Sequence, residues 1–124
     1  MNIPFSPPDI GEAEIAEVTD TLRSGWITTG PKTKKFEKLI KEYTGAAGCA
    51  CLNSQTACGE MTLRLLGVGE GDEVIVPAYT YTATASVVCH VGATLKMVDV
   101  KPGTLEMDRE KLEAAVTDKT KVII

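Results

Sequence analysis

Two polar segments of this chain have the residue types that together could bind a phosphorylated ring compound. The first, residues 53–57 ("NSQTA"), lies between the apolar run "CACL" at 49–52 and an expected helix at about 56–66. A helix that begins directly after a strand points unpaired backbone N–H groups at one place, which favours an anion such as phosphate. Thr56 adds a hydroxyl donor. The same spacing also suits an ordinary helix cap and turn, and spacing alone leaves both interpretations open.

The second segment is residues 77–86 ("PAYTYTATAS"), which brings two tyrosines together in a chain that is only 5% aromatic. We expect Tyr79 to belong to the core. Tyr81, which is followed by small residues, is suited to stack on a flat ring. A phosphate on one loop and a ring on the next describe a phosphorylated heteroaromatic cofactor. The chain lacks the GxGxxG and GK[ST] patterns, which disfavours NAD and nucleoside triphosphates.

An alternation of apolar runs and helical patterns from residue 48 onward would position both segments. The expected strands are 49–52, 73–78, 94–100 and 121–124, and the expected helices are about 56–66, 82–90 and 108–116. The strands are continuously apolar, which predicts an α/β fold with a mostly parallel sheet and helices on both faces. Ligands of such sheets bind beyond the carboxyl ends of the strands.

Side-chain patterns refine these expectations. In the helix at 56–66, we expect Met61, Leu65 and Leu66 to face the core, and Asp108 should cap the helix that follows it. The chain ends inside the apolar run 121–124, which predicts a fragment of a longer protein, truncated within a strand.

Two helices are predicted before residue 48. The first, at about 11–25, carries an apolar stripe of Ile15, Val18 and Leu22, and the second, at about 31–45, starts with Pro31 in its first turn. Its apolar residues are Phe36, Leu39, Ile40 and Tyr43. Both stripes should pack on something larger. We therefore divide the chain into an N-terminal helical segment, 1–47, and an α/β domain, 48–124.

Composition excludes several classes of function. A net charge of −4 and a pI near 5.0 argue against a nucleic-acid-binding protein. The basic run is interpreted as a solvated helix face; it consists of Lys32, Lys34, Lys35, Lys38 and Lys41. No apolar run could span a membrane and no signal peptide is evident, which predicts a cytoplasmic protein. The four cysteines, Cys49, Cys51, Cys58 and Cys89, are spaced as buried thiols rather than as metal ligands.

Five segments carry a resemblance to a known family. They are "SGWITTGPKTKKFEKLIKEYTG", "NSQTA", "GVGEGDEVIVPAYTYTATASVV", "GATLKMVDV" and "DREKLEAAVTDKTKVII". In this order they resemble the DegT/DnrJ/EryC1/StrS family, whose members are sugar aminotransferases that use pyridoxal phosphate (PLP) on the fold type I scaffold. The segment "SGWITTGPK" is most similar to enzymes that aminate a 4-keto nucleotide sugar. Residues 48–124 would then be the first part of the PLP-binding large domain.

The resemblance implies roles for single residues. The backbone at Thr56 and Ala57 and the Thr56 hydroxyl would hold the PLP phosphate, beside Gln55, a position that is commonly Gly or Ala in the family. Tyr81 would stack on the pyridine ring. The segment 26–30 would line the substrate entrance through Trp26, Thr28, Thr29 and Gly30. An alternative for Trp26 is a purely structural anchor between the first two helices.

The resemblance also implies a reaction and partners. The parent protein would transfer an amino group, with glutamate as donor, to a keto nucleotide sugar in polysaccharide biosynthesis, as a cytoplasmic homodimer. The Schiff-base lysine and the acid on the pyridine nitrogen lie beyond residue 124 in this family, so the chain alone should be inactive. Two alternatives remain: a PLP-dependent sugar dehydratase of the same family, and a non-catalytic regulatory or binding domain.

Overall fold

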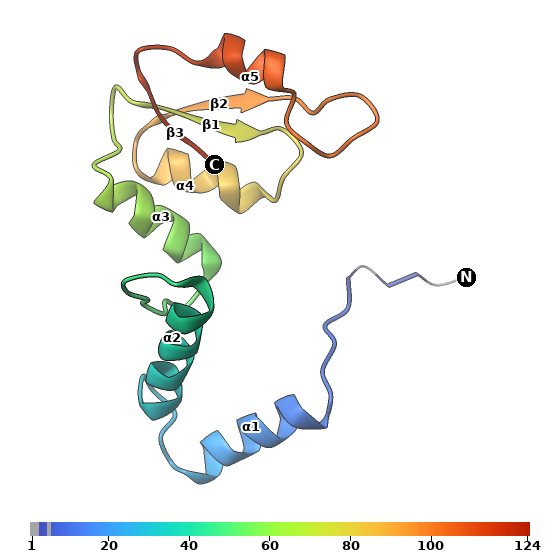
Figure 1. Ribbon diagram of the computed structural model, residues 1–124, viewed down its shortest axis with the longest axis vertical. Helices are drawn as coiled ribbons and strands as arrows, with labels where there is room; N and C mark the ends of the chain where they lie inside the picture. The colour runs from blue at the N-terminus through green and yellow to red at the C-terminus, as the bar shows by residue number, and fades with distance from the viewer. Residues whose placement is uncertain (1–2, 5) are drawn as a thin grey trace. The chain divides into compact units, whose positions relative to one another are not determined.

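The computed structural model describes residues 3, 4 and 6–124, and it divides after Cys51 into two compact units. Figure 1 shows the helices and strands of both. The N-terminal unit contains α1 (Glu12–Arg23) and α2 (Pro31–Thr44). The C-terminal unit contains the remaining helices and all strands of the described residues.

Local signals in the sequence account for the ends of the two N-terminal helices. The Glu14 carboxylate accepts a hydrogen bond of 2.7 Å from the N–H of Gly11, at the start of α1. Pro31 occupies the first turn of α2, as predicted, where its missing N–H costs no helical hydrogen bond. Gly45 ends α2 in the left-handed conformation, with φ of 70°, which favours glycine.

A lysine joins α1 to α2. Lys32 Nζ lies 2.6 Å from a carboxylate oxygen of Glu17 and 2.8 Å from one of Asp20. These contacts lower the pKa of both carboxyl groups, because the hydrogen bond and the charge of Lys32 favour their ionised forms. The Lys32 side chain remains 42% exposed, so these ion pairs lie on the surface and agree with the predicted solvated face.

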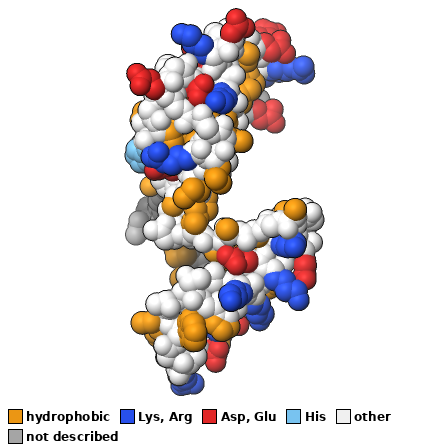
Figure 2. Space-filling model, turned by 90° about the vertical axis from the view of Figure 1, so that its left-hand side faces the viewer, with side chains coloured by type: hydrophobic (Ala, Val, Ile, Leu, Met, Phe, Trp, Pro, Cys, Tyr) orange, Lys and Arg blue, Asp and Glu red, His pale blue; other side chains and the backbone are white. Residues whose placement is uncertain are grey.

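The apolar stripes of these helices remain accessible to solvent. Neither α1 nor α2 contains a buried residue, and Ile15, Val18 and Leu22 are 50%, 60% and 64% exposed. Phe36, Leu39 and Tyr43 on α2 are exposed as well. Hydrophobic side chains are visible on the surface in Figure 2, next to charged ones. Packing of these stripes on a larger body stays a prediction.

The C-terminal unit is built on a parallel sheet in the order β2-β1-β3, as its apolar strands predict. The strands are β1 (Glu73–Pro77), β2 (Thr94–Val98) and β3 (Thr120–Ile123). Parallel neighbours need crossover connections, and these contain α4 (Thr82–His90) and α5 (Arg109–Ala115). The Asp108 carboxylate accepts from the N–H groups of Glu110 and Lys111, which confirms the predicted cap of α5.

Helices cover both faces of the sheet, which explains why the central strand is apolar from Val74 to Val76. Figure 1 shows α3 (Gln55–Leu65) and α4 on one side of the strands and α5 on the other. Val74, Ile75 and Val76 of β1 are fully buried. The core cluster consists of Leu63, Val68, Val74, Val76, Val87 and Val88.

Two predictions about single elements are wrong. Residues 49–52 form no strand, because the N–H of Cys51 donates to the Glu37 carboxylate at 2.8 Å and no described strand pairs with them. The buried face of α3 is Leu63, whereas Met61, Leu65 and Leu66 are 47%, 80% and 54% exposed. A helical pattern shows which residues share a face, but it does not show which face meets α4. The other predicted elements agree with the observed ones within about two residues.

A network of polar side chains links the start of β1 to β2 and to the segment before β3. Glu73 Oε2 lies 2.9 Å from Lys96 Nζ and accepts a hydrogen bond of 2.5 Å from the Thr117 hydroxyl. Lys96 also donates to the carbonyl of Ala115, at the end of α5. The Thr117 hydrogen bond and the Lys96 charge hold the pKa of Glu73 below its ordinary value of 4.5.

This network predicts a pH dependence of stability. The pKa of Glu73 is lower in the folded state than in the unfolded state, where it is near 4.5. The ionised carboxylate therefore stabilises the fold at a pH above 4.5. This stabilisation is lost as the pH falls through the pKa of the folded state. In urea unfolding, we expect Glu73→Gln to have a lower midpoint than the unmodified protein at about pH 7, and the difference to shrink at about pH 3. Glu70→Gln, at an exposed position, is the control. A difference that stays constant with pH would contradict the prediction.

Candidate functional site

The first turn of α3 presents two backbone donors that are not used within the described chain. Ser54 caps the helix: its hydroxyl accepts from the N–H of Ala57 at 3.0 Å, and its carbonyl accepts from Cys58 at 3.1 Å. The N–H groups of Gln55 and Thr56 have no hydrogen-bond partner among the described residues. The cap interpretation and the anion interpretation are therefore compatible, because the cap takes one donor and leaves its neighbours available.

Tyr81 stands at the start of α4 with its ring in solvent. It is the N-cap residue of the helix and is 82% exposed. Tyr79 is 66% exposed, so the expectation that it belongs to the core is wrong. The reason is local: the last hydrogen bond of the strand runs from Ala78 N to Val98 O, and beyond it the chain leaves the sheet.

The contacts between α3 and α4 bring both features to the same end of the unit. A Cβ atom at Gly59 would lie 3.6 Å from Val87, and further along both helices the Arg64 guanidinium donates to the carbonyl of His90 at 3.3 Å. The helices therefore run parallel, and their N-termini lie together. Figure 1 shows these N-termini on the side where β1 and β2 end. Backbone donors and an exposed aromatic ring thus share the carboxyl edge of the sheet, where ligands of α/β folds bind.

A cluster of polar side chains joins α3 to the C-terminal end of α4. Glu60 pairs with Arg64 at 2.9 Å and with Nδ1 of His90 at 3.0 Å. The pKa of Glu60 is lowered, first by the hydrogen bond from Arg64 and then by the one with His90. Sequence reasoning missed this contact between helices, although the spacing of Glu60 and Arg64, four residues apart, is a known pairing signal.

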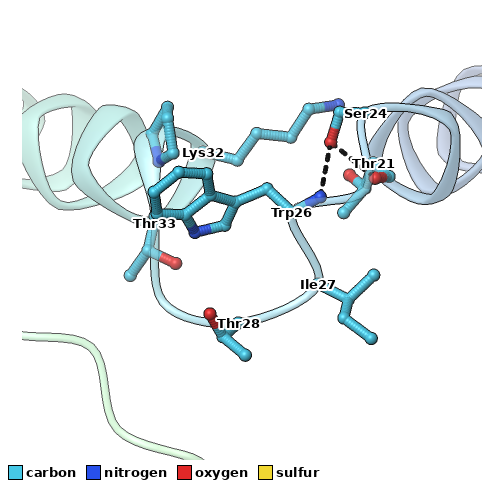
Figure 3. A pocket seen from close by; sticks show the side chains of 9 residues that line it. Thr21, Ser24, Trp26, Ile27, Thr28, Lys32 and Thr33 are labelled. Atoms are coloured by element: carbon cyan, nitrogen blue, oxygen red, sulfur yellow. Dashed lines mark hydrogen bonds between the residues drawn. The ribbon is translucent and has the colours of Figure 1, made fainter.

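The predicted substrate residues form a compact turn within the N-terminal unit. Trp26 Nε1 donates to the carbonyl of Thr29 at 3.1 Å, and the indole lies against Gly30, which is buried. In Figure 3 the indole points back toward the first turn of α2, whereas Ile27 points away from the loop. Trp26 and Thr28 line a hollow of about 320 Å³. These contacts support the structural role of Trp26; a role of the segment in binding substrate stays a prediction.

Position 30 requires glycine because the indole of Trp26 leaves no room for a side chain, and not because of its backbone conformation. Its φ of −162° is open to any residue, but a Cβ atom there would lie 2.1 Å from Trp26 Nε1. We expect Gly30→Ala to displace the indole and break its hydrogen bond with Thr29. Trp26 is the only tryptophan, so its fluorescence emission reports the change directly, as a shift to longer wavelength and stronger quenching by iodide.

Gly48→Ala is the matched control, because a Cβ atom at Gly48 would meet nothing within 4 Å. Unchanged emission in Gly30→Ala, or an equal change in Gly48→Ala, would show that Gly30 does not hold the indole.

The cysteines and helices bear on the other classes of function. Cys58 and Cys89 are exposed and Cys49 and Cys51 are half-buried, so the expectation of buried thiols is wrong. Within the residues that the structure describes, no group of three or more His, Cys, Asp or Glu side chains could hold a metal ion. None of the described helices is long and apolar enough to cross a membrane.

Comparisons with known proteins give a consistent result. The model of the DegT/DnrJ/EryC1/StrS aminotransferase family matches residues 8–124. The spore coat polysaccharide biosynthesis protein SpsC of Bacillus subtilis is 45% identical over 122 residues, which make up 98% of this chain and 31% of SpsC.

Solved structures resemble the chain over nearly its whole length. The PLP form of Spr1654, a proposed sugar aminotransferase from Streptococcus pneumoniae, is 65% identical with a TM-score of 0.88, and the match covers 99% of this chain and 31% of that one. GDP-4-keto-6-deoxy-D-mannose-3-dehydratase of Escherichia coli, with bound hydrated PLP, is 28% identical with a TM-score of 0.86. This match covers 98% of this chain and 33% of the dehydratase. The predicted α/β fold of a fold type I PLP-dependent transferase is confirmed, and the chain spans about a third of these relatives.

Proposed function

The chain belongs to the DegT/DnrJ/EryC1/StrS aminotransferase family, and from this premise we propose that the protein uses PLP to transfer an amino group to a keto nucleotide sugar. Glutamate is the amino donor, and the protein works in the cytoplasm as a homodimer. The resemblance to SpsC, a polysaccharide biosynthesis protein, and to the PLP form of Spr1654 supports a role in building an amino sugar.

The observation that carries the proposal is the pair of open N–H groups beside an exposed tyrosine at the carboxyl edge of the sheet. The open N–H groups of Gln55 and Thr56 match the acceptor oxygens of a phosphate, and the positive end of the α3 dipole adds attraction for its charge. Ala57 contributes the N–H that is already bonded to Ser54, which fixes the turn. In this proposal residues 48–124 are the first part of the PLP-binding domain, and the Thr56 hydroxyl is a further donor to the phosphate.

Tyr81 supplies the surface for the ring. An aromatic side chain that is 82% exposed gains little from burial in the fold, whereas stacking on a pyridine ring would cover one of its faces. PLP, when bound, supplies an electron sink for the reacting carbon. The residues of this chain hold and orient the cofactor through its phosphate and one ring face. In the N-terminal unit, Trp26, Thr28, Thr29 and Gly30 are assigned to the substrate entrance.

Sugar dehydration is the second candidate reaction. The observation that favours it is the likeness to the Escherichia coli dehydratase, which reaches a TM-score of 0.86 over 98% of this chain. Both reactions need the same phosphate and ring contacts, so residues 48–124 fit either one. The aminotransferase is preferred because the more similar relative, at 65% identity, is a proposed sugar aminotransferase. A non-catalytic PLP-independent binding domain is the third alternative.

The reaction can be tested with labelled nitrogen. The full-length parent protein, loaded with PLP, is given ¹⁵N-glutamate and a 4-keto nucleotide sugar, and the sugar product is analysed by mass spectrometry. We expect the label in the product, because an aminotransferase moves the donor nitrogen to the sugar. A product that has lost oxygen and contains no ¹⁵N would favour the dehydratase, and the absence of PLP binding would contradict both PLP-dependent reactions.

Substitution of Tyr81 tests the proposed ring contact. We expect Tyr81→Ala to raise the dissociation constant for PLP about tenfold, because an aromatic pair contributes about 0.5–1.5 kcal/mol beyond the burial of its area. Tyr79→Ala is the matched control, since Tyr79 is also exposed and stands two residues away. Equal effects of the two substitutions, or no effect of Tyr81→Ala, would remove Tyr81 from the site.

A further inference from the structure

Tyrosine is an unusual residue for the cap of α4. Helix N-caps favour Ser, Thr, Asp and Asn, whose short side chains accept a hydrogen bond from the first turn. Tyr81 makes no such side-chain bond. The Tyr81 side chain therefore does not fix the start of α4, and other contacts around the turn hold the backbone of Tyr81.

One of these contacts is a hydrogen bond between two threonines on either side of the cap. Thr80 Oγ1 and Thr84 Oγ1 lie 3.0 Å apart, and the N–H of Thr84 donates to the carbonyl of Tyr81 at 3.0 Å. The residue before the tyrosine and the third residue after it are thus joined by their side chains. Threonine is stiff at χ1, so a bond between two threonines holds the turn more firmly than one between longer side chains.

We propose that the Thr80–Thr84 hydrogen bond positions the Tyr81 ring for stacking on the cofactor. Thr80 and Thr84 are then positioning residues that act through Tyr81 and touch no ligand themselves. This inference rests on the proposed function, because it assumes that Tyr81 contacts PLP.

The physical reason is the cost of ordering a mobile side chain. A ring that is 82% exposed has few neighbours to hold it, and freedom lost on binding weakens affinity. A turn that is already fixed in the ligand-free protein removes part of this loss. The effect should be seen in the affinity for PLP and in the mobility of Tyr81 before PLP is added.

The test uses variants that differ by a single hydroxyl group. Thr84→Val keeps the shape and removes the bond, Thr84→Ser restores a hydroxyl, and Thr82→Val is the control, since no side-chain bond of Thr82 is present in the described chain. We expect Thr84→Val to weaken PLP binding threefold to tenfold, Thr84→Ser to recover most of the loss, and Thr82→Val to bind normally. NMR relaxation of the ligand-free protein should show a more mobile Tyr81 ring in Thr84→Val alone.

A double variant that combines Thr84→Val with Tyr81→Ala distinguishes a positioning role of Thr84 from a general effect on the stability of the protein. If Thr84 acts through the ring, Thr84→Val should have no further effect on PLP binding in the Tyr81→Ala background. An effect of equal size in both backgrounds would overturn the proposal, as would a failure of Thr84→Ser to recover binding. If the unmodified protein does not bind PLP, the proposed function fails first; if it binds PLP and Thr84→Val binds equally well, only the positioning role fails.

Discussion

The packing of α3 on α4 is the interaction on which the candidate site depends. Leu63 and Val87 are 2% and 3% exposed, and burial of such side chains contributes about 1.5–3 kcal/mol each. Because Gly59 brings no side chain, α3 approaches Val87 closely, and the contact of Arg64 with His90 further along makes the helices parallel. The N–H groups of Gln55 and Thr56 and the ring of Tyr81 share one end of the unit for this reason. Hydrogen bonds of Glu60 and Arg64 with His90 join the two helices further along.

Much of the C-terminal unit could be predicted from the sequence because its signals are local. The continuous apolar run of β1 predicts a strand covered on both faces, and Asp108 predicts the start of α5. The errors concern partners that lie far away in the chain. Residues 49–52 form a continuous apolar run, yet a strand exists only where another strand pairs with it. Likewise, the buried face of α3 is chosen by α4 and not by the pattern of α3 itself.

In the candidate site, too, local features could be predicted from the sequence and contacts between distant segments could not. The start of a helix after residues 53–57 could be predicted, because small polar residues between an apolar run and a helical pattern are typical of a cap, and Ser54 caps α3. Phosphate binding by this segment stays a prediction. The contact of Trp26 with Gly30, the ion pairs of Lys32 and the Glu60–His90 pair could not be predicted, since each depends on how two segments meet in space. Tyr79 and Tyr81 have similar sequence neighbours. The exposure of both follows only from the point at which the chain leaves the sheet after Ala78.

The central claim is that the first turn of α3 binds a phosphate through donors that its own cap leaves open. The most direct measurement is the change of the backbone amide NMR signals as PLP is added to the protein. The signals of Gln55 and Thr56 should move downfield and saturate together, whereas the signal of Ala57, already bonded to Ser54, should move much less. Changes centred elsewhere, or equal changes at Ala57 and its neighbours, would contradict a phosphate site at this turn.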